Sequence, residues 1–231
     1  MRTRLVQPEW LDTLDAADSR ARRARADLVR VHLLMGHRLS LPGILSHVLD
    51  GLPSEPHVIE LGAGDGALLH TLAPGLARQH PRLRLTLLDR SRTVSAAAAG
   101  FSTPGWQVEA AVADVFDWIG SDASADLVFC SLFLHHFEDT ELRRLLAGIA
   151  LKTGAFVACE PRRSGLGLAA SHLLGLAGCT AVTRHDAVVS VRAGFSGNEL
   201  SRHWPHSATH PWTLEERALA PFSHLFVALR A

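Results

Sequence analysis

A carboxylate followed by a run of glycines is the feature of this 231-residue chain that points most directly to ligand chemistry. Residues 58–67 read Val-Ile-Glu-Leu-Gly-Ala-Gly-Asp-Gly-Ala, so an apolar run ends at Glu60 and passes into a loop with glycine at every second position. Such a run predicts a buried parallel strand that turns sharply into a helix. Glycine has no Cβ and takes positive φ, so a ligand can lie against this backbone, beside the free N–H groups of the helix start.

This loop fits two nucleotide-binding patterns. Gly62 to Ala67 satisfies the dinucleotide pattern G-x-G-x-x-G/A, and Asp89 lies about where that fold places a ribose-binding acid. Read from Glu60 to Gly66, the same residues are Glu-x-Gly-x-Gly-x-Gly. The carboxylates of Glu60 and Asp65 would repel a pyrophosphate at the helix start, but would tolerate a cofactor with an ammonium group and a sulfonium centre. The chemistry therefore favours the second pattern.

The second pattern resembles the nucleotide loop of class I S-adenosylmethionine-dependent methyltransferases. The resemblance covers about residues 56–160 and includes residues 126–137, which are similar to the fourth motif of that family and contain its His-His pair. It implies S-adenosylmethionine as the cofactor. Residues 8–12 and the arginine-rich stretch 22–30 resemble bacterial methyltransferases of polyketide or phenolic metabolite pathways.

Strand-like and helical patterns alternate from residue 57 onward, which predicts an α/β fold with a doubly wound, mostly parallel sheet. The last two strand-like runs are separated by only four residues, too few for a helical crossover, so they predict a C-terminal antiparallel hairpin. The resemblance to methyltransferases implies the same arrangement, a Rossmann-like fold with seven strands. The expected strands are 57–61, 84–89, 106–112, 125–131, 154–159, 212–219 and 224–230, and the expected helices are 15–35, 41–52, 66–79, 91–99 and 139–151.

The chain is expected to have an N-terminal helical extension or cap and one catalytic domain. The cap comprises residues 1–53 and the methyltransferase domain residues 54–231, with a lid-like segment at 161–210. Within that segment, residues 164–183 carry no Asp, Glu, Lys or Arg. Their length approaches a membrane span, but four glycines and several polar residues favour a lid over an apolar pocket.

Acidic residues follow successive strands at the edge of the sheet where open parallel folds bind ligands. The Asp89 carboxylate can accept both ribose hydroxyls, and the resemblance implies that Asp114 contacts the adenine amino group. Each acid alone would also serve as a helix cap, but three of them with the glycine loop favour a nucleoside site. The residues expected to hold the cofactor are Glu60, Gly62, Ala63, Gly64, Gly66, Asp89, Arg90, Asp114, Val115, Phe116 and Ser131.

Two adjacent histidines are the candidates for a catalytic base. A hydroxyl acceptor loses its proton as it attacks the methyl group, and histidine is the usual base near neutral pH. His135 ranks before His136 because it is nearer the strand end, although one or both can instead position the loop. Glu160 is the next candidate, for binding an acceptor polar group. The pair His203 and His206 has no carboxylate or cysteine at ligand spacing, so no metal is expected.

The charge balance and the cysteine content limit the binding partners and the cellular compartment that we expect. Lys plus Arg and Asp plus Glu both total 23, so the net charge is zero and long-range attraction to nucleic acid is not expected. The three cysteines follow no metal spacing and indicate reduced thiols in the cytoplasm. We expect a monomer or homodimer that spans no membrane and takes a small-molecule acceptor.

The sequence thus predicts a methyltransferase for a small, partly apolar metabolite, acting most readily at a phenolic hydroxyl. The uncharged lid and the nearby Trp204, Trp212 and Phe195 suit an apolar pocket. Two alternatives remain open: an NAD(P)-dependent oxidoreductase, and a non-catalytic S-adenosylmethionine-binding partner subunit.

Overall fold

A single seven-stranded sheet forms the centre of the computed structural model, which describes residues 3–15, 17–206 and 211–231. The strand order is β3-β2-β1-β4-β5-β7-β6; β1 to β5 are parallel, and β7 pairs antiparallel with both β5 and β6. This confirms the predicted α/β fold with its C-terminal hairpin. The strands are β1 (His57–Leu61), β2 (Leu83–Asp89), β3 (Trp106–Val112), β4 (Ala125–Ser131), β5 (Thr153–Pro161), β6 (Trp212–Leu219) and β7 (Ser223–Arg230).

Burial along the strands follows their place in the sheet. The central strands β4 and β5 are buried over most of their length, as expected of strands covered by helices on both faces. The edge strands β3 and β6 instead alternate between more buried and exposed residues, because one face of each is only partly covered. The apolar runs and the alternating runs of the sequence therefore mark different positions in the same sheet.

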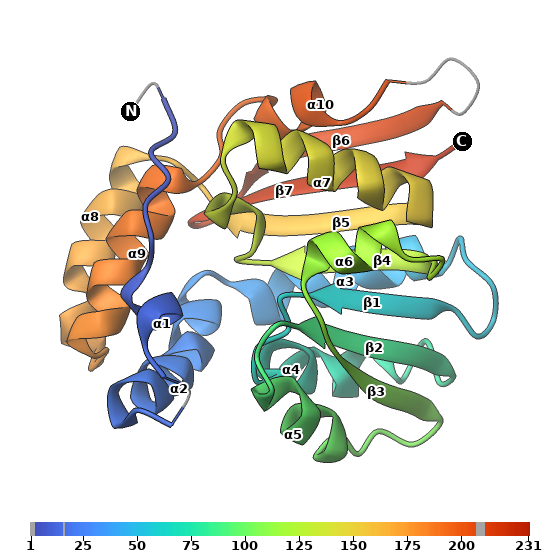
Figure 1. Cartoon of the computed structure of the whole chain (residues 1–231), viewed down its shortest axis with the longest axis horizontal. Coiled ribbons are helices and arrows are strands. Elements are labelled where there is room, and N and C mark those ends of the chain that lie inside the picture. The colour runs from blue at the N-terminus through green and yellow to red at the C-terminus, as the bar shows by residue number, and fades with distance from the viewer. Residues whose placement is uncertain (1–2, 16, 207–210) are drawn as a thin grey trace.

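Helices cover both faces of the sheet and create two separate hydrophobic cores (Figure 1). One core contains residues of α3, α4 and α5, and the other contains residues of α6, α7 and α10. This arrangement leaves the carboxyl ends of the parallel strands free of crossover helices. The helices named here are α3 (His37–Leu49), α4 (Ala67–Leu76), α5 (Thr93–Ala99), α6 (Val115–Gly120), α7 (Asp139–Lys152) and α10 (Glu199–His203).

The N-terminal helices and the segment after β5 meet beyond the carboxyl ends of the parallel strands, on the left of Figure 1. There α9 contacts α1, α2 and α8, and also the short 3-10 helix η1 that follows β4. These elements come from the two ends of the chain and enclose the same edge of the sheet. They are α1 (Trp10–Thr13), α2 (Ser19–Leu34), η1 (Leu134–His136), α8 (Gly165–Leu173), η2 (Leu174–Ala177) and α9 (Ala181–Ala193).

Several expected boundaries were wrong for local reasons. The first long helix begins at Ser19 and not at residue 15, because the Asp18 carboxylate caps it by accepting the Arg20 N–H at 2.7 Å. The next helix begins at His37, directly after Gly36 in the left-handed conformation. The fifth strand continues to Pro161, so Glu160 lies inside it. Residues 181–193, which fall in the expected lid-like segment 161–210 but had no helix of these bounds predicted, form α9.

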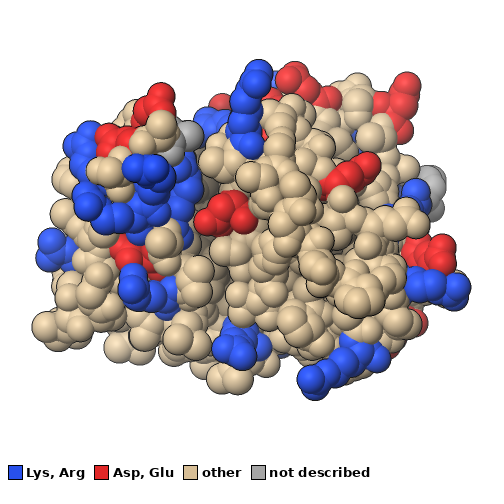
Figure 2. Space-filling model, turned by 90° about the horizontal axis from the view of Figure 1, so that it is seen from below, with Lys and Arg blue, Asp and Glu red and all other residues tan. Residues whose placement is uncertain are grey.

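The arginines of α2 form part of the surface. Figure 2 shows basic side chains gathered on the left of the molecule, and α2 carries Arg20, Arg22 and Arg23 in exposed positions. A narrow hollow separates this part from the larger part of the same face.

Within the described residues, no helix has the length and apolar character needed to cross a membrane. The last four residues of the expected lid segment, 207–210, lie outside the described part of the chain.

Candidate active site

The glycine loop lies between the end of β1 and the start of α4. Gly62, Gly64 and Gly66 all have positive φ, at 68°, 58° and 69°. A Cβ at Gly62 would stand 2.4 Å from the ring of Phe133, so this position admits only glycine without movement of that ring. Ala63 is buried within the loop. The sequence pattern thus reports a backbone conformation that the fold requires.

Asp89 fixes this loop from the neighbouring strand. One carboxylate oxygen accepts the Gly64 N–H at 2.8 Å, and the other accepts the Ser91 N–H at 2.7 Å. The backbone N–H groups of Gly62 and Ala63 donate to the Leu88 carbonyl. The ends of β1 and β2 are therefore held together where a ribose-binding carboxylate was expected.

Two buried polar atoms at this edge have no partner among the described residues. They are Oε2 of Glu60, at the end of β1, and Oγ of Ser131, at the end of the adjacent β4. Burial, together with the nearby charges of Asp89 and Asp65, raises the pKa of Glu60 to about 8. A buried polar atom without a partner costs free energy, so a bound group with hydrogen-bond donors would stabilise this edge.

The third predicted acid lies at the start of α6. Asp114 is exposed, and its Oδ1 caps the helix by accepting the Phe116 N–H at 2.7 Å. Val115 is buried, whereas Phe116 is half-buried and meets the ring of Phe137 edge-on, with 5.7 Å between ring centroids. An aromatic surface next to an exposed carboxylate is a suitable surface for a flat, hydrogen-bonding ring.

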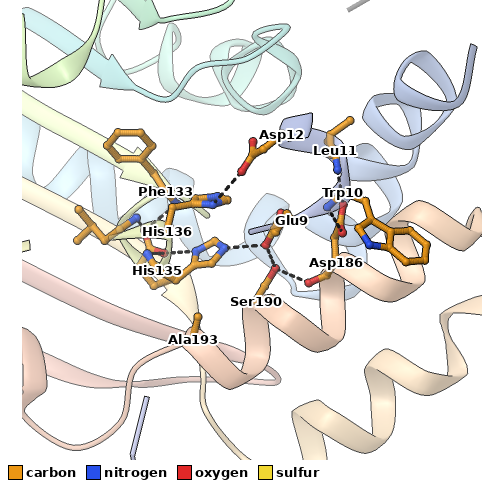
Figure 3. Close-up of polar contacts among 12 residues, drawn as sticks. Glu9, Trp10, Leu11, Asp12, Phe133, His135, His136, Asp186, Ser190 and Ala193 are labelled. Carbon is orange, nitrogen blue, oxygen red and sulfur yellow. Dashed lines mark hydrogen bonds and ion pairs between the residues drawn. The ribbon is translucent and has the colours of Figure 1, made fainter. Parts of the chain in front are cut away.

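His135 is a buried imidazole held between two carboxylates (Figure 3). Its Nδ1 lies 2.9 Å from Oε2 of Glu160, and its Nε2 lies 3.2 Å from Oε1 of Glu9. Burial works against its positive charge, but the hydrogen bonds to the two carboxylates prevail and raise the pKa of His135 to about 9. At neutral pH it is therefore an imidazolium with both nitrogens occupied.

Glu160 fastens the loop that carries both histidines. Its Oε1 accepts the backbone N–H groups of Phe133 at 3.0 Å and Leu134 at 2.9 Å, and its Oε2 accepts the N–H of His135 at 3.3 Å. Burial acts to raise the pKa of Glu160, but these bonds and the charge of His135 lower it on balance. The loop begins with Leu132 at a φ of 54°, a conformation that is uncommon outside glycine and clusters at functional sites.

His136 lies nearer the surface and pairs with the carboxylate of Asp12. Its side chain is 27% exposed, and Nδ1 lies 3.4 Å from Oδ2 of Asp12. The other Asp12 oxygen lies 3.4 Å from Arg90, which directly follows the ribose-side acid Asp89. Asp12 therefore connects the histidine pair with the nucleotide side of the site.

The N-terminal segment that carries Glu9 and Asp12 is fixed to the rest of the site by many bonds. The Asp186 carboxylate of α9 accepts the backbone N–H groups of Trp10 at 2.8 Å and Leu11 at 3.0 Å. The Trp10 ring stacks on His185, with 3.8 Å between centroids. Glu9 accepts a short hydrogen bond from Ser190, also of α9.

Arg4 fastens the beginning of this segment. Its guanidinium donates to the carbonyl oxygens of Phe137 at 3.0 Å and Ala193 at 2.9 Å, and it pairs with Asp139 at 2.8 Å. We call residues 4–13 the N-terminal strap. It crosses from α9 and α7 to the histidine pair.

The structure brings the predicted cofactor residues and the predicted catalytic residues to one edge of the sheet. The sequence reasoning missed Glu9 and Asp12, for which it had no chemical role. Their only signal was their spacing on either side of Trp10, which does not reveal that they reach histidines more than 120 positions away.

The other histidine considered from the sequence, His203, lies away from this cluster. Its Nε2 is 3.8 Å from Oδ1 of Asp139, and burial is the main cause that lowers its pKa.

Comparison with known proteins agrees with this geometry. Residues 58–152 match a family model described as a methyltransferase domain. No curated protein sequence matches the chain significantly.

Solved methyltransferase structures share the fold over nearly the whole chain. The plantazolicin methyltransferase BpumL in complex with SAH is similar at 12% identity and a TM-score of 0.68, covering 93% of this chain and 92% of that one. An O-methyltransferase family protein from Burkholderia thailandensis has 21% identity and a TM-score of 0.56, covering 94% and 61%. Magnesium protoporphyrin IX methyltransferase from Synechocystis PCC 6803, with bound SAM, has 12% identity and a TM-score of 0.52, covering 96% and 88%.

The matches therefore agree with the sheet order and the glycine loop. Residues 58–152 match a methyltransferase domain, and the chain as a whole has the fold of solved methyltransferase structures.

Proposed function

We propose that this protein transfers the methyl group of S-adenosylmethionine to a hydroxyl of a small, partly apolar metabolite. The observation that carries the proposal is the buried Oε2 of Glu60, which has no hydrogen-bond partner in the described part of the chain, beside a glycine loop that Asp89 holds in shape. A glycine cradle with acids on both sides fits a cationic nucleoside better than a pyrophosphate. When bound, S-adenosylmethionine supplies a methyl group already activated on a sulfonium centre.

The cofactor residues divide by position. Gly62, Ala63, Gly64 and Gly66 provide the cradle, with Arg90 at its rim. Asp89 would bind the ribose and Asp114 with Val115 and Phe116 the base, while Glu60 and Ser131 would accept hydrogen bonds from polar groups of the cofactor. The placement at this edge follows the carboxyl-end rule for open sheets, and the role of Asp114 toward the base is the one that the family resemblance implies.

Of the two candidate histidines, we assign the base to His136. Its ring is partly exposed, and Asp12 lies on one nitrogen, an arrangement that orients an imidazole and stabilises the imidazolium after proton transfer. Both ring nitrogens of His135 already contact carboxylates, those of Glu160 and Glu9, so this ring is the less suited of the two to take the proton of the acceptor. We therefore assign His135 and Glu160 to positioning the loop that carries His136.

The reaction requires alignment and a place for one proton. Bound S-adenosylmethionine would supply the methyl group, with the sulfur keeping the electron pair of the broken bond, and His136 would take the proton of the acceptor hydroxyl as its oxygen accepts that group. Holding the reacting groups in this geometry can supply about 7–11 kcal/mol of the barrier reduction. The strap places Glu9 and Asp12, so we assign it to a cap that completes the site. Helix α3, which also belongs to the predicted extension 1–53, instead packs in the core with α4 and α5.

The proposed acceptor class is supported by the elements around the histidines. The α8 segment has no Asp, Glu, Lys or Arg, and it packs against α9, which supplies His185 and Ser190 near the strap. One similar structure belongs to an enzyme named for a small molecule, magnesium protoporphyrin IX. The link to bacterial polyketide or phenolic pathways is supported by residues 8–12 and 22–30 of the sequence alone.

The test is methyl transfer to a panel of phenols, aliphatic alcohols and amines, with products identified by mass spectrometry. We expect at least one phenol to be methylated, and His136→Ala to lower kcat about 100-fold or more while cofactor binding persists. His47→Ala, an exposed residue of α3, is the matched control and should retain full activity. Methylation of an amine and of no hydroxyl compound would refute the O-methylation proposal.

A further inference from the structure

Three potential metal ligands converge where the N-terminal strap meets the histidine pair (Figure 3). Glu9, His135 and His136 each offer one ligand atom, and these atoms all lie within 4.8 Å of one another. The strap and the loop after β4 are 126 positions apart at the Glu9–His135 contact. The cluster is thus created by the tertiary fold, unlike the local pair His203 and His206.

The distances suit a shared ion. Oε1 of Glu9 and Nε2 of His135 are 3.2 Å apart, and the centroids of the His135 and His136 rings are 4.3 Å apart. Zinc binds imidazole nitrogen and carboxylate oxygen at about 2.0–2.2 Å in tetrahedral sites. Two ligands 3.2 Å apart can therefore both reach one ion between them without a large movement.

Independent support comes from the groups behind these ligands. Metal-bound histidines almost always donate their other ring N–H to a carboxylate or carbonyl, which fixes the tautomer. Glu160 occupies this position: its Oε2 lies 2.9 Å from Nδ1 of His135, so a neutral His135 would direct the lone pair of Nε2 toward Glu9. Ser190 donates to Glu9 in the same way. The ligands His135 and Glu9 are therefore already oriented in the metal-free structure, by Glu160 and Ser190.

The local charge also suits a cation. Three carboxylates, those of Glu9, Asp12 and Glu160, surround the two imidazoles. The nearby Arg4 guanidinium is engaged with Asp139 and with backbone carbonyl oxygens. The two outer ligands, Glu9 and His136, are 12% and 27% exposed, which provides a route from solvent.

We propose that Glu9, His135 and His136 form a binding site for one divalent transition-metal ion, with Zn²⁺ as the ion these ligands suit best. Mixed imidazole and carboxylate ligands favour Zn²⁺ over Mg²⁺ or Ca²⁺, which prefer oxygen alone. Three protein ligands leave one position of a four-coordinate ion for water or another oxygen. Asp12, 3.4 Å from His136, is the nearest further carboxylate.

This site has a consequence that rests on the proposed function. The nitrogen lone pair of His136 that binds the ion can no longer accept a proton. Bound Zn²⁺ and base catalysis by His136 therefore exclude each other, and saturating Zn²⁺ should inhibit methyl transfer.

The test is calorimetric titration of the metal-free full chain with ZnCl₂ and, separately, MgCl₂, followed by metal analysis after desalting. We expect one equivalent of Zn²⁺ to bind with micromolar or tighter affinity and Mg²⁺ not to bind. Glu9→Gln and His136→Gln should each weaken Zn²⁺ binding at least tenfold. Glu160→Gln should weaken it about 10–100-fold through His135.

His203→Gln is the matched control, because it removes a histidine that lies outside the cluster. Circular dichroism and binding of S-adenosylhomocysteine on the same samples show whether each variant is folded and whether the cofactor site is intact. Zn²⁺ binding lost in the Glu9 and His136 variants but kept in the control supports the site. No stoichiometric binding, or binding equal in all variants, would overturn it, whatever the result with S-adenosylhomocysteine.

Discussion

Glu160→Gln is the substitution whose effect follows most directly from the geometry of the site. The side chain is fully buried and binds His135 together with the backbone N–H groups of Phe133 and Leu134. Glutamine has nearly the same volume as glutamate, so the substitution leaves no cavity that would lower the free energy of unfolding. It does remove the negative charge, and it puts an NH₂ group, a donor, where a carboxylate oxygen accepted hydrogen bonds. Breaking a buried pair by removing one partner costs about 3–5 kcal/mol. We expect the free energy of unfolding to fall by that amount, a large part of the 5–15 kcal/mol typical of such domains.

Urea denaturation of metal-free protein at pH 7.5 measures this loss. Glu215→Gln is the matched control, because Glu215 pairs with Arg217 at the surface, where the two side chains are 56% and 45% exposed. Exposed pairs contribute about 0–1 kcal/mol, so the control should stay within that range. A loss below about 1 kcal/mol for Glu160→Gln would refute the view that this carboxylate holds the loop in place.

Three further results are expected. Gly62→Ala should lower the free energy of unfolding by about 2–4 kcal/mol and weaken S-adenosylhomocysteine binding at least tenfold, because the added Cβ would stand 2.4 Å from the Phe133 ring at a φ of 68°. The control Gly165→Ala has open space around the added Cβ and should change neither quantity. Equal effects of the two substitutions would contradict this explanation. Burial lowers the pKa of His32 to about 4 and of His37 to about 3, so below pH 6.5 the unfolded chain binds protons at these two residues that the folded chain does not. In urea denaturation, the double variant His32→Gln with His37→Gln should therefore lose about 2–4 kcal/mol less stability between pH 7.5 and pH 5 than the unsubstituted protein, and an equal change in both proteins would exclude a buried neutral pair. Asp12→Asn should lower kcat about tenfold with cofactor affinity kept, whereas an unchanged kcat would show that this carboxylate does not assist the base.

The sheet could be predicted closely because its signals are local. Residues 106–112, 125–131 and 212–219 form strands with the predicted boundaries, since apolar runs and turn residues determine them. The boundaries of helices depend on capping and on contacts with other elements. Helix α9 was missed because its sequence has only a weakly amphipathic pattern, and it is stabilised by packing against α1, α2 and α8.

The candidate site could be predicted only in part, because its chemistry depends on long-range contacts. The glycine loop, Asp89 and the histidine pair are recognisable from short motifs. That His135 lies between Glu160 and Glu9 depends on contacts across 25 and 126 positions, which no local pattern reveals. The preferred base candidate differs for this reason. Proximity to the strand end favoured His135 in the sequence, whereas the contacts in the structure favour His136.

The central claim is that the edge of the sheet between Glu60 and Asp114 binds S-adenosylmethionine. Calorimetric titration of the purified protein with S-adenosylhomocysteine and with NADH, repeated on Asp89→Ala, tests it most directly. We expect micromolar binding of S-adenosylhomocysteine, at least tenfold weaker in the variant, and no binding of NADH. Binding of NADH alone would contradict the claim and indicate a dinucleotide site.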